Sequence, residues 1–250
     1  INKKSDLVIV PSNFNKQILE NTQYDIHHPQ TKQKMGILKC TKPIVVLHEG
    51  LDINTFRKIN ANEESSLVND EIKHIKEDFL FLFCGHFLNG SLGQDRKDVG
   101  MLCKTFFESF KGKTNAPALL LKTSAGNYSA MDRDVILDKI KEIRKTVSGK
   151  ILPNIYVLHG DLTNEEMNAL YNHYRIKAYV SFHKGESFGR PMLEFASTGK
   201  PLIVSNWSGQ LDYLKPEYNT LLPGDLTPVH KSAQWKDIII VNSKLGLELA

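Results

Sequence analysis

Short runs of apolar residues recur along the second part of the chain, and each has the length of a buried β-strand. Segments with helical spacing fill the gaps between these runs, and the clearest examples are residues 99–110 and 131–147. Fully apolar strands that alternate with helices are typical of a parallel sheet covered on both faces. We therefore predict an α/β fold, a doubly wound, Rossmann-like parallel sheet, from about residue 75 onward. The predicted strands are residues 79–84, 118–122, 155–158, 178–182 and 202–205.

The N-terminal part has a sparser pattern. Residues 6–10 and 43–47 are short apolar strand candidates, and Ser12 follows the first as the expected N-cap of a helix. The polar stretch 22–34 reads as an irregular loop. Its adjacent histidines, His27 and His28, have no third ligand nearby, so we expect solvated side chains rather than a metal site.

A polar patch around residues 60–66 marks the expected domain boundary. We assign residues 1–60 to the tail of one domain together with an interdomain link. Residues 61–250 form the second domain. The chain begins with Ile1 rather than Met, which suggests a fragment of a longer protein.

The stretch from Glu186 to residue 205 reads as loop, helix and strand. Pro191 suits the first helical turn and Gly199 suits the position just past the helix end, so the helix should span about residues 190–198. Glu186 would then face the helix N-terminus and Glu194 would lie one turn inside it. This arrangement favours an anion flanked by two carboxylates. The alternative is that Glu186 caps backbone amides and Glu194 is a surface charge.

A glycine-rich loop, residues 85–98, follows the first predicted strand of the large sheet and ends with Arg96 and Lys97. Because the carboxyl ends of parallel strands meet at one rim, this loop should meet the loops after the other four strands there. Backbone amides and the two cations could then reach a phosphate. The loop matches neither the dinucleotide-binding nor the P-loop pattern, so a solvated surface loop is the alternative.

Composition and charge narrow the function classes. The net charge of +4 is compatible with an anionic small ligand or a membrane surface but requires neither. The sequence has no zinc-finger spacing, RNA-binding aromatic motif or long basic run that would indicate nucleic-acid binding. No apolar run approaches the length of a membrane span. The cysteines are Cys40, Cys84 and Cys103, an odd number without ligand spacing. We expect buried free thiols in a reducing compartment, hence a cytoplasmic protein, with attachment to a membrane left open.

The residues from Glu186 to Glu194 (ESFGRPMLE), followed by FASTGKPLIVS up to Ser205, resemble a known signature. It is that of retaining GT-B glycosyltransferases of family 4, also called group 1, whose usual form is E-G-F-G-x-P-x-x-E-A-M-A-x-G-x-P-V-I-A-S. Residues 8–12 are similar to the last strand of the family's acceptor domain. Residues 48–56 resemble its interdomain link, and the Arg96-Lys97 pair resembles the segment that opens its donor domain. The resemblance covers most of residues 5–224.

The resemblance implies that a nucleoside-diphosphate sugar binds as donor substrate, without another cofactor. By similarity Lys97, with Arg96, neutralises the diphosphate, helped by backbone amides at Phe188, Gly189 and Arg190. A departing diphosphate develops negative charge, which cations stabilise without a bound metal.

The same resemblance gives the two carboxylates different roles. Glu194 would accept hydrogen bonds from the ribose diol, and Glu186 would hold donor-sugar hydroxyls near the anomeric carbon as the catalytic carboxylate. The acceptor would be a glycan, a lipid or a small molecule. Where this family often has arginine, the chain has His86.

We thus predict the donor-binding half of a retaining glycosyltransferase that moves a sugar to an unknown acceptor. Most of the N-terminal acceptor domain lies outside the sequence, so the fragment alone should be inactive. The alternative is a nucleotide-sugar-binding module without transferase activity. A dinucleotide oxidoreductase is a distant third, since no G-x-G-x-x-G follows a strand.

Overall fold

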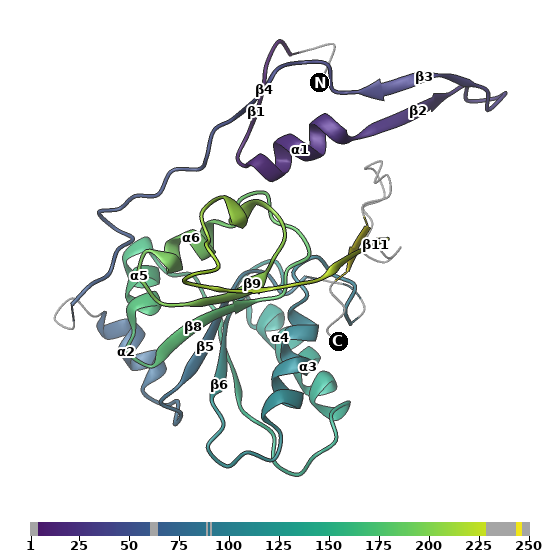
Figure 1. Cartoon of the computed structure of the whole chain (residues 1–250). Coiled ribbons are helices and arrows are strands. Elements are labelled where there is room, and N and C mark those ends of the chain that lie inside the picture. Colours follow the sequence, from purple (N-terminus) through teal and green to yellow (C-terminus); the bar gives the residue numbers. More distant parts are fainter. Residues whose placement is uncertain (1–4, 61–64, 89, 91, 229–243, 247–250) are drawn as a thin grey trace.

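The computed structural model describes residues 5–60, 65–88, 90, 92–228 and 244–246 of the chain. Its centre is a six-stranded sheet in which every pair of neighbouring strands is parallel (Figure 1). In spatial order the strands are β10 (Thr220–Leu222), β9 (Leu202–Ser205), β8 (Ile176–Ser181), β5 (Leu80–Cys84), β6 (Ala118–Lys122) and β7 (Ile155–Leu158). All five predicted strands of this sheet are therefore confirmed, within two residues at their ends.

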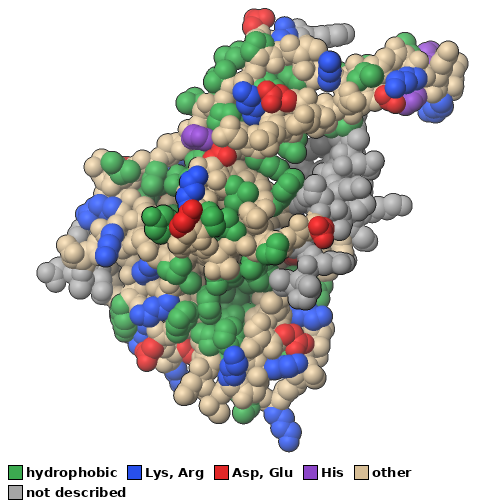
Figure 2. Space-filling model, viewed as in Figure 1, with side chains coloured by type: hydrophobic (Ala, Val, Ile, Leu, Met, Phe, Trp, Pro, Cys, Tyr) green, Lys and Arg blue, Asp and Glu red, His purple; other side chains and the backbone are tan. Residues whose placement is uncertain are grey.

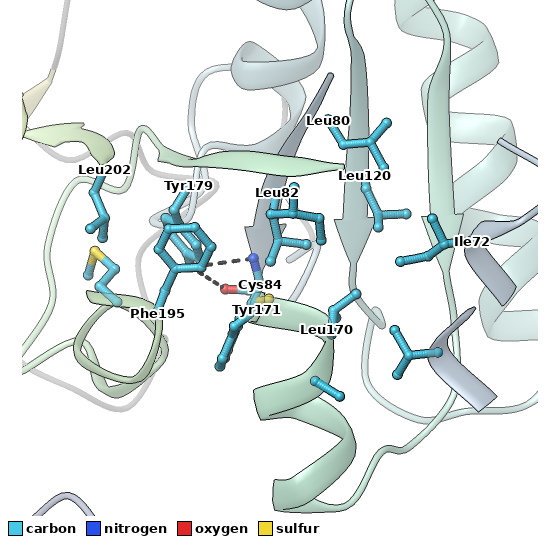
Figure 3. Close-up of a cluster of buried hydrophobic side chains, with 14 of the residues drawn as sticks. Ile72, Leu80, Leu82, Cys84, Leu120, Leu170, Tyr171, Tyr179, Phe195 and Leu202 are labelled. Atoms are coloured by element: carbon cyan, nitrogen blue, oxygen red, sulfur yellow. Dashed lines mark hydrogen bonds between the residues drawn. The ribbon is translucent and has the colours of Figure 1, made fainter. Parts of the chain in front are cut away.

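Helices cover both faces of the sheet because successive strand residues point to opposite sides. Leu80 and Leu82 of β5 join a core with α2 (Ser66–Ile72), α5 (Asn164–Asn172) and α6 (Arg190–Ala196). Figure 3 shows this core, in which Tyr179 also bonds the backbone of Cys84. On the other face, Phe83 packs with α3 (Val99–Phe110) and α4 (Ala130–Lys145). The predicted doubly wound architecture is confirmed.

The register of the strands places their carboxyl ends at one rim. Cys84 pairs with Lys122, Lys122 pairs with Leu158, and on the other side Ser181 pairs with Val204. The loops that follow these strands consequently emerge on the same edge of the sheet, as the sequence predicted.

Local signals set the helix starts. The Ser12 hydroxyl accepts a hydrogen bond from the Asn15 amide at the start of α1 (Asn13–Asn21). Thr163 and Glu166 form a reciprocal capping box at α5, as their spacing predicts. Helix α6 ends at Ala196, earlier than predicted.

The N-terminal unit consists of α1, a two-stranded parallel sheet and a hairpin. The parallel strands are β1 (Val8–Val10) and β4 (Ile44–Val46), and the hairpin strands are β2 (Gln23–His27) and β3 (Lys34–Lys39). The hairpin projects from the body of the molecule, and histidine and lysine side chains gather at its end (Figures 1 and 2).

The prediction of an irregular loop at residues 22–34 is wrong for residues 23–27, which form β2, and is confirmed only for the turn at residues 28–33. Tyr24 and Ile26 do alternate with polar residues, as in a strand, but the surrounding stretch is mostly polar. Neither face of the hairpin enters a core, so its strands carry no longer apolar pattern. Among the described residues no group of three or more His, Cys, Asp or Glu side chains is arranged to hold a metal ion. His27 and His28 accordingly belong to no such group.

The link between the units runs into the core of the larger one. Phe56 is buried against Tyr171, with ring centroids 6.4 Å apart, and Leu51 packs on the same cluster. Residues 61–64, at the predicted boundary, lie outside the described residues. On the C-terminal side, a 3-10 turn (Gly209–Asp212) follows β9, and β11 (Asp225–Pro228) pairs with β12 (Lys244–Gly246) in antiparallel fashion.

The three cysteines are free, as predicted. Cys84 and Cys103 are buried, and burial raises the pKa of each thiol to about 12. Cys40 is only half-buried, which corrects the expectation that all three would be inside. None of the helices in the described part of the chain is long and apolar enough to cross a membrane.

Candidate functional site

Three side chains that are distant in the sequence meet at the sheet rim. The Lys97 ammonium contacts Oε1 of Glu186, and the Arg96 guanidinium lies 3.2 Å from the same oxygen. Arg96 also donates a hydrogen bond of 2.8 Å to the Gly185 carbonyl. The glycine-rich loop after β5 and the loop after β8 thus meet at one rim, as predicted, and two cations and one carboxylate join them, which the sequence did not predict.

This contact controls the charge of Glu186. Burial is the largest single influence and opposes ionisation of its carboxyl group. The groups around it, Lys97 foremost and Arg96 among the rest, together outweigh burial, so the pKa of Glu186 falls below its ordinary value. The carboxylate is consequently ionised at neutral pH. An anion that binds Lys97 must compete with Glu186, and an incoming polyhydroxyl group can take over the released oxygens.

Glu194 lies in a different environment. Its side chain is 11% exposed, with Oε2 accepting a 3.0 Å hydrogen bond from the Tyr171 hydroxyl and Oε1 accepting one of 3.0 Å from Arg190. Burial raises the pKa of Glu194 despite these bonds. The interpretation of Glu194 as a plain surface charge is therefore wrong, because its side chain is buried between α6 and Tyr171 of α5.

The backbone at the start of α6 is held in one conformation. Gly189 has φ of 85°, and the Tyr213 hydroxyl donates to the carbonyls of Phe188 and Gly189 at 2.9 and 2.7 Å. The Phe188 side chain is buried. The Arg190 side chain points to Glu194, so of these three residues only the backbone amides could serve as predicted.

A second loop, after β9, fixes the backbone beside Glu186. The Glu186 amide donates to the Ser208 hydroxyl at 3.2 Å, and the Gly209 amide donates to the Glu186 carbonyl at 3.0 Å. A Cβ on Gly209 would lie 2.0 Å from the Ser187 carbonyl oxygen. Only glycine allows this close approach.

Behind Glu186 lies His183, which is fully buried. Its ring is 3.1 Å from the Ser181 hydroxyl at Nδ1 and 3.3 Å from the Ser205 hydroxyl at Nε2, and these two serines end β8 and β9. Burial lowers the pKa of His183 to about 4. The ring is therefore a neutral tie between two strand ends. His86, in contrast, bonds Ser124 at 3.1 Å.

A cavity of about 440 Å³ separates the carboxylate loop from α1. Arg96, Glu186 and Ser187 line one side, and Phe14, Ile18 and Leu19 line the other. The two units touch beside it, where the Asn13 amide donates to Asp212 at 2.8 Å and Phe14 meets Trp207 edge-on at 5.2 Å. The site therefore has a charged wall from the large unit and a largely apolar wall from the N-terminal unit.

No protein-family model and no curated protein matches the sequence. Solved structures do match. They include sucrose-phosphate synthase from Thermosynechococcus elongatus, with 16% identity and a TM-score of 0.57 over 89% of this chain and 46% of that one. The UDP-forming α,α-trehalose-phosphate synthase from Burkholderia xenovorans, in complex with glucose-6-phosphate, has 12% identity and a TM-score of 0.56 over 86% and 50%. Anabaena Alr3699/HepE, in complex with UDP-glucose, has 15% identity and a TM-score of 0.54 over 90% and 52%.

These neighbours are glycosyltransferases of the GT-B class, and the chain spans about half the length of each. At such low identity the likeness establishes the fold. The fold of the larger unit is that of the Rossmann-like domain of GT-B glycosyltransferases.

Sequence reasoning missed the residues that hold the site together from behind. His183 and Lys184 lie just before the motif, separated from Glu186 by Gly185, and Tyr171 and Tyr213 come from other elements. The sequence offers one signal for such residues. The polar pair His183-Lys184 directly follows an apolar strand, which marks these positions as candidates for a role beside Glu186.

Proposed function

We propose that this chain is the donor-binding half of a retaining glycosyltransferase of the family-4 type, which moves a sugar from a nucleoside-diphosphate sugar to an acceptor. The observation that carries the proposal is the convergence of Arg96 and Lys97 with Glu186 at the rim, together with the buried Glu194 one turn inside α6. Such a set offers cations to a diphosphate and carboxylates to sugar hydroxyls.

In the proposed complex the diphosphate takes the place of Glu186 on Lys97 and Arg96. Two cations near the bridging and terminal oxygens stabilise the charge that develops as the nucleoside diphosphate departs, and we assign this work to them rather than to a metal ion. Glu186 then holds donor-sugar hydroxyls and, as an ionised carboxylate, favours the positive charge that develops on the sugar.

Glu194 is proposed to accept hydrogen bonds from the ribose diol. Its orientation is already fixed by Tyr171 and Arg190, so little conformational entropy is lost when the ribose binds. The UDP-glucose held by the Anabaena neighbour supports a UDP-sugar as the first donor to test. The acceptor would enter the cavity between Glu186 and α1.

Calorimetric titration of the chain with UDP, GDP and UDP-glucose tests the proposal. We expect binding of at least one nucleotide. Glu194→Ala and Lys97→Met should each raise Kd by about 10- to 100-fold, because each removes a charge-assisted hydrogen bond. Lys141→Met, on the exposed side of α4, is the matched control and should leave Kd unchanged. Absence of binding by the wild-type chain, or binding indifferent to Glu194→Ala, would overturn the proposal.

A nucleotide-sugar-binding module without transferase activity is the alternative, since the charged groups of the site could bind a donor without turnover. A turnover assay on the complete gene product with the donor that binds separates the two. Release of nucleoside diphosphate that depends on an added acceptor and on Glu186 supports the enzyme, and tight donor binding without release supports the module.

A further inference from the structure

A buried ion pair lies directly behind the proposed donor site. Nζ of Lys184, two residues before Glu186, is 3.4 Å from Oδ2 of Asp98, the residue after Lys97. The exposed fractions of the two side chains are 10% and 4%. The pair thus joins the same two loops that carry the cations and the carboxylate, but from the interior side.

Asp98 occupies this position at a cost. Its φ of 52° lies in the left-handed region, and its side chain makes no capping hydrogen bond to α3. Its Oδ1 is buried without a hydrogen-bond partner among the described residues. Burial raises the pKa of Asp98 to about 6, although Lys184 acts in the opposite direction. Backbone strain and an unsatisfied buried oxygen both oppose stability.

A lone buried ion pair is weak evidence for stability, since an uncharged pair of similar size is often as stable. The pair does, however, connect the loop after β8 to the loop that carries Arg96 and Lys97. The Lys184 amide donates to the Arg96 carbonyl at 2.8 Å, and the Lys184 ammonium also contacts the Gly93 carbonyl. Asp95 in turn accepts the Asp98 amide at 2.8 Å. The backbone on both sides of Arg96 and Lys97 is therefore tied to the loop after β8.

We infer that Lys184 and Asp98 are positioning residues that hold Arg96 and Lys97 in the geometry that binds the donor diphosphate. This inference rests on the proposed function. Strain and unsatisfied polar groups tend to persist where they arrange a functional site, and small displacements of positioned charges reduce binding strongly. Neither side chain needs to contact the ligand.

The test uses three variants of the chain: Lys184→Met, Asp98→Asn, and the double variant that carries both. The double variant removes both charges of the pair, so it does not leave the Asp98 carboxylate buried without Lys184 as the single lysine variant does, and Asp95 still has Lys139 nearby. The matched control is the double variant Lys141→Met with Asp138→Asn, an exposed pair at 2.9 Å on α4. The measurements are Kd for UDP and GDP, the thermal unfolding midpoint, and amide hydrogen exchange of residues 92–98.

We expect the buried double variant to unfold near the wild-type temperature, to bind the nucleotide about tenfold more weakly, and to exchange faster at residues 92–98. Asp98→Asn alone should also weaken binding. If Lys184 instead contacted phosphate directly, Asp98→Asn would release its ammonium and leave binding equal or tighter, which would overturn the inference. Unchanged Kd and unchanged exchange in the double variant would overturn it as well.

The exchange measurement separates this inference from the proposed function. A wild-type chain that binds neither UDP nor GDP contradicts the proposed function. Faster exchange at residues 92–98 in the double variant, without change in the control, would still show that the pair orders the loop carrying Arg96 and Lys97. Exchange that stays at the wild-type level contradicts the inference whether or not nucleotide binds.

Discussion

The two units of the molecule bury their sheets to very different extents. In the large unit every residue of β6 is buried, and helices cover both faces. In the N-terminal unit, Ile9 and Val45 of the small parallel sheet are 58% and 49% exposed, and Ile37 of the hairpin is 52% exposed. A two-stranded sheet is at best marginally stable by itself. The candidate donor site is therefore built on the unit that has its own core, and the N-terminal unit supplies only one wall of the cavity.

The largest difference between the two units is expected in unfolding free energy when a buried side chain is truncated. Phe107 on α3 is fully buried in the second core cluster, so Phe107→Ala should cost about 3–5 kcal/mol of unfolding free energy. Ile37→Ala on the exposed hairpin should change it by no more than about 0.5 kcal/mol. Urea unfolding monitored by circular dichroism measures both. Equal effects would mean that the hairpin is part of the cooperative core.

The next effect is a pH dependence that arises from His183, a residue of the large unit. Because burial lowers the pKa of His183 to about 4, the unfolded chain binds a proton between pH 6.5 and 4 that the folded chain does not. Stability should therefore fall as pH decreases through this range, by about 3 kcal/mol at pH 4 from this residue. His183→Gln should flatten that part of the profile, and His27→Gln on the exposed hairpin is the matched control. Parallel profiles for wild type and His183→Gln would contradict the assignment.

A smaller effect comes from paired glycine substitutions. A Cβ on Gly209 meets the Ser187 backbone, whereas a Cβ on Gly36 of the hairpin meets nothing within 4 Å. Gly209→Ala should cost about 2 kcal/mol and displace the Glu186 loop, so nucleotide binding should weaken too. Gly36→Ala should be close to neutral. Thermal unfolding and nucleotide titration of both variants check this, and a neutral Gly209→Ala would show that the loop after β9 shifts without consequence.

The sequence predicted the large unit well because its strands are fully apolar and its helices are amphipathic, so length and periodicity agree. The capping signals at Ser12 and Thr163 were equally direct. The hairpin was missed because it contributes to no core, so the short alternation around Tyr24 and Ile26 stands alone in a mostly polar stretch.

Within the site, the meeting of the loops that carry Arg96, Lys97 and Glu186 followed from parallel topology. The tie between Lys184 and Asp98 did not, since nothing in the sequence reveals which of many charged residues lie under the rim. The burial of Glu194 likewise depends on contact with Tyr171, a residue of another helix.

The central claim is that a diphosphate replaces Glu186 on Lys97. The most direct measurement compares Kd for UDP and for UDP-glucose, or for the corresponding guanine pair, in the wild type, Lys97→Met and Glu186→Gln. We predict that Lys97→Met weakens both ligands, whereas Glu186→Gln leaves the nucleoside diphosphate equally or more tightly bound and removes the extra affinity due to the sugar. If Glu186→Gln weakens the nucleoside diphosphate as much as Lys97→Met does, the carboxylate does not compete for the cation and the account is contradicted.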